Sequence, residues 1–175
     1  MVKIASLAAA LVLVASIGAA KAGELTAAKV TEMQEAWGDG IVKIGSIYTA
    51  GGDYKAAAKE HLEAFYAYGQ EDVLFKPTLA AADQFRGTFD EALSYFVGGV
   101  VSEDKGFAIA PYTKVRWENE GTILQGDSAV AMGNYFFTKT DGAEVKVEYT
   151  FGIEKMDDGS FKFVLHHSSL PYQPG

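Results

Sequence analysis

The strongest secondary-structure signal of this chain lies in residues 128–169, SAVAMGNYFFTKTDGAEVKVEYTFGIEKMDDGSFKFVLHHSS. Apolar and polar residues alternate along it with a period of two, which is typical of half-buried strands. Asp141-Gly142 and Asp158-Gly159 interrupt the alternation, and each pair favours a tight hairpin turn. The segment therefore predicts three strands that pair antiparallel in sequence order, over residues 128–138, 144–155 and 160–169.

The pattern upstream of these strands is mainly helical. The alternation reaches back to Tyr112, and residues 73–78 predict one further strand. Before them, apolar residues between Val30 and Tyr48 recur at spacings of three and four, which indicates one long amphipathic helix. A second helix is expected over residues 54–68, with Asp53 as its N-cap.

A short third helix is expected to begin at Thr88, which forms a capping-box pattern with Glu91, and to end near Tyr95. Helices gathered before an antiparallel sheet define an α+β fold. A curved sheet wrapped around the long helix encloses a pocket, so we expect a single cone-shaped domain over residues 23–175.

Residues 1–22 have the pattern of a secretory signal peptide. Lys3 precedes an uncharged run from Ile4 to Ile17, and small residues follow at Ala20 and Ala22. The run is shorter than the roughly 20 residues that cross a bilayer as a helix. We therefore expect export to the periplasm and a mature form that does not span a membrane.

Composition excludes several classes of function. The chain has no cysteine, which rules out disulfides, a thiolate nucleophile, an iron–sulfur cluster and cysteine-ligated zinc. Its formal net charge is −8 and it contains no basic run, so nucleic acid is not an expected partner.

The last strand carries the chemical clue. Strict alternation places one apolar row on the inner face of the sheet, ending in His167 and Ser169, whereas His166 and Ser168 belong to the other face. A buried imidazole and hydroxyl need hydrogen-bond partners or a function. Both a structural and a functional role therefore remain open for His167. His166 is expected to face solvent or a subunit neighbour, and His61 to lie on the surface of the second helix.

A zinc site is not expected from the three histidines. Adjacent strand residues point to opposite faces, so His166 and His167 cannot converge on one ion with His61. No spacing typical of zinc enzymes is present either. We predict neither a metal nor another cofactor.

The terminal segment HHSSLP, residues 166–171, resembles the HHSSxP signature of the iota-class carbonic anhydrases. Further similarity to that family lies in residues 73–80, 92–99, 103–108, 131–137 and 145–152. The resemblance implies a cystatin-like fold of the ketosteroid-isomerase type, self-association as a homodimer, and reversible, metal-independent hydration of carbon dioxide to bicarbonate. In a cyanobacterial member, the thylakoid lumen would be the alternative destination.

The resemblance also implies site residues. Catalytic hydroxyls carry over onto Thr78, Tyr95 and Ser169, with His167 beside them. Substrate contacts are expected from Phe75, His166 and Ser168. In this interpretation His167 is the general base or proton relay and the hydroxyls bind the developing bicarbonate.

Two other function classes remain open. One is an isomerase or dehydratase on a larger ligand, for which Asp83 is a candidate base. The other is an exported module that binds a small anion, or associates with itself, without turnover.

Overall fold

The computed structural model describes residues 23–174, so the predicted signal peptide lies outside the described residues. The elements, in chain order, are α1 (Ala27–Thr49), α2 (Tyr54–Phe65), β1 (Leu74–Lys76), α3 (Phe89–Val97), the 3-10 turn η1 (Phe107–Ile109), β2 (Tyr112–Gln125), β3 (Ser128–Lys139), β4 (Glu144–Lys155) and β5 (Phe161–Ser169). None of the described helices is long and apolar enough to cross a membrane.

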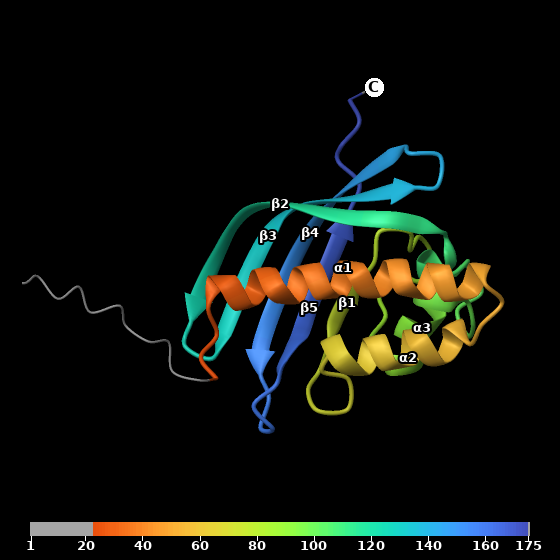
Figure 1. Ribbon diagram of the computed structural model, residues 1–175. Coiled ribbons are helices and arrows are strands. Elements are labelled where there is room, and N and C mark those ends of the chain that lie inside the picture. The colour runs from red at the N-terminus through yellow and green to blue at the C-terminus, as the bar shows by residue number, and fades with distance from the viewer. Residues whose placement is uncertain (1–22, 175) are drawn as a thin grey trace, which may run out of the picture.

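The strands form one sheet in the order β1-β5-β4-β3-β2. Strands β2 to β5 pair antiparallel in sequence order, as predicted, and β1 joins β5 in parallel. Gly142 and Gly159 take the left-handed φ that their hairpin turns require. In Figure 1, α1 crosses one face of the curved sheet, and α2 and α3 lie toward the same side. This arrangement confirms the α+β cone.

The helices begin where the capping residues place them. Thr26 and Asp53 each accept a backbone hydrogen bond at the start of α1 and α2. Thr88 and Glu91 form the predicted capping box of α3. The second helix, however, ends at Phe65 instead of residue 68. Tyr66 is extended and pairs with Phe163 of β5, because tertiary pairing replaces the last helical turn.

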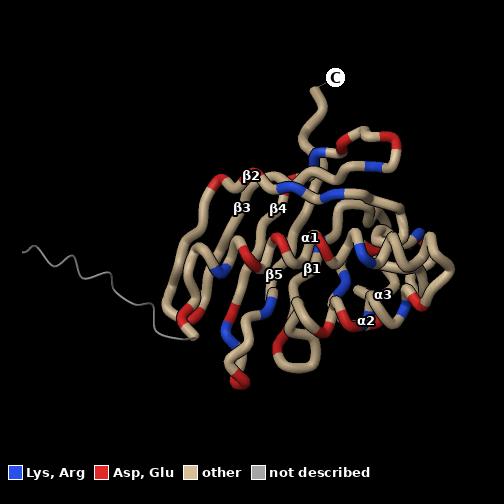
Figure 2. The backbone as a smooth tube through the Cα atoms, in the orientation of Figure 1, with Lys and Arg blue, Asp and Glu red and all other residues tan. Residues whose placement is uncertain are grey.

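The core between α1 and the sheet is aromatic. Trp37 of α1 is 1% exposed and packs against rings from β3, β4 and β5. The neighbouring Gly38 lets α1 lie close to β2, because a Cβ added at this position would be only 2.9 Å from Cβ of Val115. Lys and Arg are interspersed with Asp and Glu over the described chain, without a continuous basic stretch in that view (Figure 2).

Candidate active site

A β-bulge in β5 reverses the predicted orientation of its functional end. Gly152 of β4 pairs with Leu165 and Ile153 pairs with Phe163, which leaves Val164 as an extra residue in β5. An extra residue shifts the alternation by one position. Side chains beyond Val164 therefore face the opposite way from the prediction.

His166 and Ser168 are the inward residues, with exposed fractions of 2% and 3%. His167 is exposed and Ser169 is half-buried on the other face of the sheet. The hydroxyl of Ser169 donates to Glu148 at 2.8 Å, on that outer face. The prediction that His167 and Ser169 end an inward row is thus wrong, and so is the expectation that His166 faces solvent.

Thr78 meets Ser168 at the inner end of β5. The parallel pairing of Lys76 with His167 brings the chain just after β1 level with the end of β5. Oγ1 of Thr78 consequently lies 3.0 Å from Oγ of Ser168, within hydrogen-bond distance. Tyr135, an inward residue of β3, lies near both hydroxyls, which lower the pKa of its phenol.

Tyr95 joins this region from α3. Its hydroxyl accepts a long hydrogen bond, 3.4 Å, from the backbone N–H of Leu79, the residue after Thr78. Burial raises the pKa of Tyr95 and the pKa of Tyr135 well above the usual value for tyrosine. Both phenols therefore stay protonated at neutral pH and can act as hydrogen-bond donors.

His166 lies deeper in the cone, between two tyrosine hydroxyls. Its Nδ1 is 2.7 Å from the hydroxyl of Tyr66, and its Nε2 is 3.3 Å from that of Tyr135. The ring of Phe75 stacks on the imidazole with centroids 4.9 Å apart. Burial lowers the pKa of His166 to about 3, with a smaller contribution from the neighbouring His167. The imidazole is therefore neutral at physiological pH.

A pocket of about 370 Å³ lies next to Tyr95, the one residue of this group that lines it. Leu79 and Tyr95 form part of its wall, and Phe107 and Tyr112 supply further apolar surface. The ring of Phe107 stacks on Tyr95 with centroids 5.5 Å apart. Glu103, Asp104 and Lys105 also line the pocket, so its wall is apolar on one side and charged on the other.

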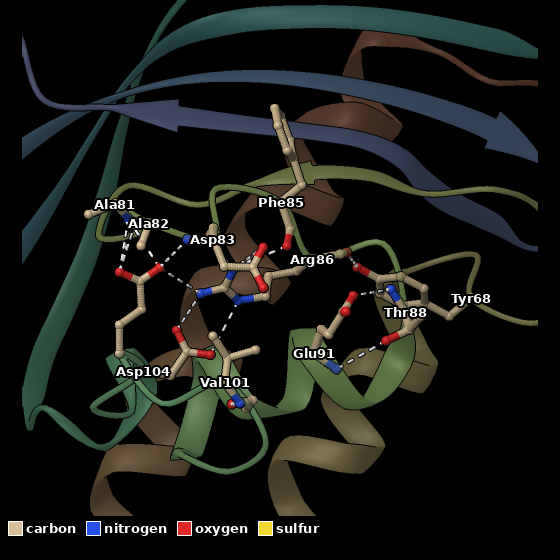
Figure 3. Close-up of polar contacts among 12 residues, drawn as sticks. Tyr68, Ala81, Ala82, Asp83, Phe85, Arg86, Thr88, Glu91, Val101 and Asp104 are labelled. Carbon is tan, nitrogen blue, oxygen red and sulfur yellow. Dashed lines mark hydrogen bonds and ion pairs between the residues drawn. The ribbon is translucent and has the colours of Figure 1, made fainter.

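Charged side chains fix the loop that carries Thr78 through hydrogen bonds and an ion pair. Arg86 is fully buried, and its guanidinium donates two hydrogen bonds to Asp104, at 2.6 and 3.2 Å (Figure 3). The carboxylate of Glu103 accepts the backbone N–H groups of residues 81–83. These contacts hold the segment between β1 and α3 in one conformation.

Asp83, the candidate base of an isomerase, lies in the same loop between β1 and α3. Its side chain is 58% exposed and lies 3.8 Å from Arg86. It is therefore a surface carboxylate and does not point into a buried pocket.

His61 is also placed differently from the prediction. It is 6% exposed, packs between Phe65 and Phe96, and its Nε2 has no hydrogen-bond partner. Burial lowers its pKa to about 3. Its spacing of three residues from Ala58, which the helical pattern places in the core, could have identified it as buried. Among the described residues, no three His, Asp or Glu side chains are arranged to hold a metal ion.

Sequence reasoning placed Trp37 in the apolar stripe of the long helix but did not single out Tyr66 or Tyr135 as site residues. The inward position of Tyr135 follows from the alternation of β3 and could have been read from the sequence. No comparable signal marks Tyr66, because its position depends on pairing with β5 after α2 has ended.

The comparisons with known proteins agree with one another. The protein-family model "Metal-independent carbonic anhydrase" matches residues 28–170. A metal-independent carbonic anhydrase of Nostoc sp. strain PCC 7120 is 40% identical over 154 residues, which cover 85% of this chain and 75% of that protein.

Solved structures extend this similarity to the fold. The crystal structure of a cyanobacterial iota-carbonic anhydrase complexed with bicarbonate matches with a TM-score of 0.83 and 38% identity, and covers 87% of this chain and 96% of that one. A calcium/calmodulin-dependent protein kinase II association domain from Xanthomonas campestris matches with a TM-score of 0.59 at 21% identity, covering 89% of this chain and 95% of that one, which indicates a shared fold alone. The chain belongs to the metal-independent carbonic anhydrase family.

Proposed function

We propose that this protein catalyses the reversible hydration of carbon dioxide to bicarbonate at the hydroxyl cluster of Thr78, Ser168, Tyr135 and Tyr95. The observation that carries the proposal is the 3.0 Å contact between the Thr78 and Ser168 hydroxyls at the inner end of β5. Family membership and the bicarbonate complex of an iota-carbonic anhydrase 38% identical to this chain support it.

The cluster has no strong base, which limits the mechanism. Water has a pKa of 15.7, and that of His166 is about 3. Complete proton transfer from water to this imidazole would be uphill by roughly 13 pKa units, or about 17 kcal/mol. His167, the base expected from the sequence, is exposed on the outer face of the sheet. A histidine general base is therefore not part of the proposal.

A hydroxyl relay avoids this cost. The oxygen of a water molecule attacks the carbon of carbon dioxide while one water proton moves to the oxygen of Thr78 or Ser168. The same hydroxyl releases its own proton to an oxygen of carbon dioxide, so each side chain ends as it began. The product is carbonic acid, which ionises in solution to bicarbonate and a proton.

The tyrosines stabilise the charge that develops during this step. The hydroxyls of Tyr95 and Tyr135 are protonated donors in an apolar setting. Fixed donors directed at a developing oxyanion lower the barrier without reorganisation of solvent. The surrounding aromatic rings favour entry of apolar carbon dioxide over larger anions.

Adjacent serines on opposite faces of β5 provide the sharpest test. Ser168→Ala should lower kcat/KM for carbon dioxide hydration by about 100-fold, the lower end of what a positioned proton-transfer group contributes. Ser169→Ala removes the same group from the outer face and should stay within about twofold of the wild type. Stopped-flow measurements with a pH indicator, before and after exhaustive chelation, would give these rates. Equal losses in both variants would contradict the assignment, and bicarbonate binding without turnover would indicate a non-catalytic module.

We also propose that the protein is exported and forms a homodimer. Cell fractionation of the full chain, compared with a chain starting at Gly23, tests the export role of residues 1–22. For the dimer, the outer face of the sheet offers an apolar row in register: Leu74, Leu165, Gly152, Val130 and Ile123. Val130→Lys should convert the dimer to a monomer in analytical ultracentrifugation, and a wild-type monomer at high concentration would contradict the proposal.

A further inference from the structure

We infer that Trp37 and Tyr66 fix His166 as the tautomer that carries its proton on Nε2, so that the imidazole positions Tyr135 as a hydrogen-bond donor to the hydroxyl cluster. His166 is then a positioning residue and not a proton acceptor. The consequence for catalysis rests on the proposed function. The tautomer itself does not, because two hydrogen bonds in the core determine it, from Trp37 to Tyr66 and from Tyr66 to His166.

The direction of these bonds starts at Trp37. Its indole Nε1 lies 3.1 Å from the hydroxyl oxygen of Tyr66, and an indole N–H can only donate. Tyr66 therefore accepts this hydrogen bond with one of its oxygen lone pairs. Both side chains are buried, with exposed fractions of 1% and 2%, so bulk water does not compete.

The second bond follows from the single proton of Tyr66. Among the described contacts its hydroxyl has one other partner, Nδ1 of His166 at 2.7 Å. If Nδ1 carried a proton, Tyr66 would accept twice and its own proton would be left buried without an acceptor. Since unpaired buried donors are unfavourable, Tyr66 donates to an unprotonated Nδ1.

The third bond transmits this direction to the site. A neutral imidazole with an unprotonated Nδ1 carries its proton on Nε2, which lies 3.3 Å from the hydroxyl of Tyr135. Nε2–H therefore donates to the oxygen of Tyr135. The proton of Tyr135 is then not used by His166 and can be donated to the neighbouring hydroxyls of Ser168 and Thr78, which themselves lie 3.0 Å apart.

The chain of donors thus runs one way, from Trp37 through Tyr66 and His166 to Tyr135. It ends where the substrate oxygens would lie, and each bond polarises the next. The lone pair of Nδ1 is occupied by Tyr66 and Nε2 is protonated, so the imidazole has no free position for a proton from water. This arrangement explains why a histidine is useful in a cluster of hydroxyls without acting as a base.

Nuclear magnetic resonance tests the tautomer directly. In protein labelled with ¹⁵N on the histidine rings, His166 should show a protonated Nε2 and an unprotonated Nδ1 at neutral pH. Tyr66→Phe should raise the population of the other tautomer. Tyr54 is a half-buried tyrosine of α2 that takes no part in these hydrogen bonds, so Tyr54→Phe should not change the tautomer. A protonated Nδ1 in the wild type would overturn the inference. Because no substrate is present, this result is independent of the proposed activity.

Two substitutions of His166 test its role in turnover. His166→Gln retains an N–H donor near the position of Nε2 but cannot accept a proton near neutral pH, and His166→Leu has no donor. We expect His166→Gln to exceed His166→Leu by at least tenfold in kcat/KM, with the folding of each verified by circular dichroism. Equal rates in the two folded variants would contradict a donor role. Absence of hydration in the wild type would refute the proposed function and leave the tautomer assignment standing.

Discussion

Mild acid should destabilise this protein because two imidazoles are buried without charge. Burial lowers the pKa of His61 and of His166 from 6.5 to about 3. Below pH 6.5 the unfolded chain binds protons that the folded chain does not, so the free energy of unfolding falls as the pH falls. The full contribution is present above pH 6.5 and is lost progressively toward pH 3.

The magnitude follows from linkage. Between pH 7 and pH 5 each histidine should lower the free energy of unfolding by about 2 kcal/mol, and the pair by about 4 kcal/mol. Carboxylates remain mostly ionised in both states over this range and contribute little. Urea unfolding followed by tryptophan fluorescence at pH 7, 6 and 5 measures the loss.

Single variants separate the two histidines. His61→Leu removes one buried imidazole, and its Nε2 has no partner to lose, so this variant should show about half of the pH dependence of the wild type. The reasoning is refuted if His61→Leu unfolds with the same pH dependence as the wild type, or if stability is constant from pH 7 to pH 5.

Two further predictions concern the elements that position Thr78 and Ser168. Arg86→Met leaves the buried carboxylate of Asp104 without its partner and should lower the free energy of unfolding by about 3–5 kcal/mol in urea titrations, whereas Lys29→Met, at an exposed ion pair with Glu32, should cost less than about 1 kcal/mol. Deletion of Val164 removes the bulge residue without changing which face Ser168 occupies, so the folded variant should keep measurable hydration. Insertion of an alanine after Leu165 should instead reverse the two faces and abolish activity. A completely inactive but folded deletion variant would contradict the role assigned to the bulge.

Local patterns in the sequence predicted most of the fold. The period of two, the hairpin turns and the capping residues act over a few neighbouring positions, and the strands, the turns and the starts of the helices agree with them. The two differences have non-local causes. Helix α2 stops at Phe65 because Tyr66 pairs with β5, and β5 changes parity because it accommodates an extra residue opposite Gly152.

The sequence indicated which types of residue form the candidate site, but not which histidine and which serine face the inside of the cone. Thr78 and Tyr95 lie in or beside the hydroxyl cluster and Phe75 packs on the imidazole, while their roles in catalysis stay predictions. Of the adjacent pairs in the HHSS segment, strict alternation selected His167 and Ser169, whereas His166 and Ser168 are the buried members. Strict alternation predicts the wrong face for every residue of a strand that follows one inserted residue, here Val164.

By itself, the sequence determined the fold class, the capped helices, the hairpins, the absence of thiol chemistry and the presence of a hydroxyl-rich segment with two histidines. Only the tertiary structure decided which histidine and which serine are buried inside the cone, and which donors direct the imidazole. The reason is geometric. A Cβ added to Gly152 would lie 3.0 Å from Cβ of Leu165, so this glycine lets the bulged strand approach, and such a contact exists only after distant strands have paired.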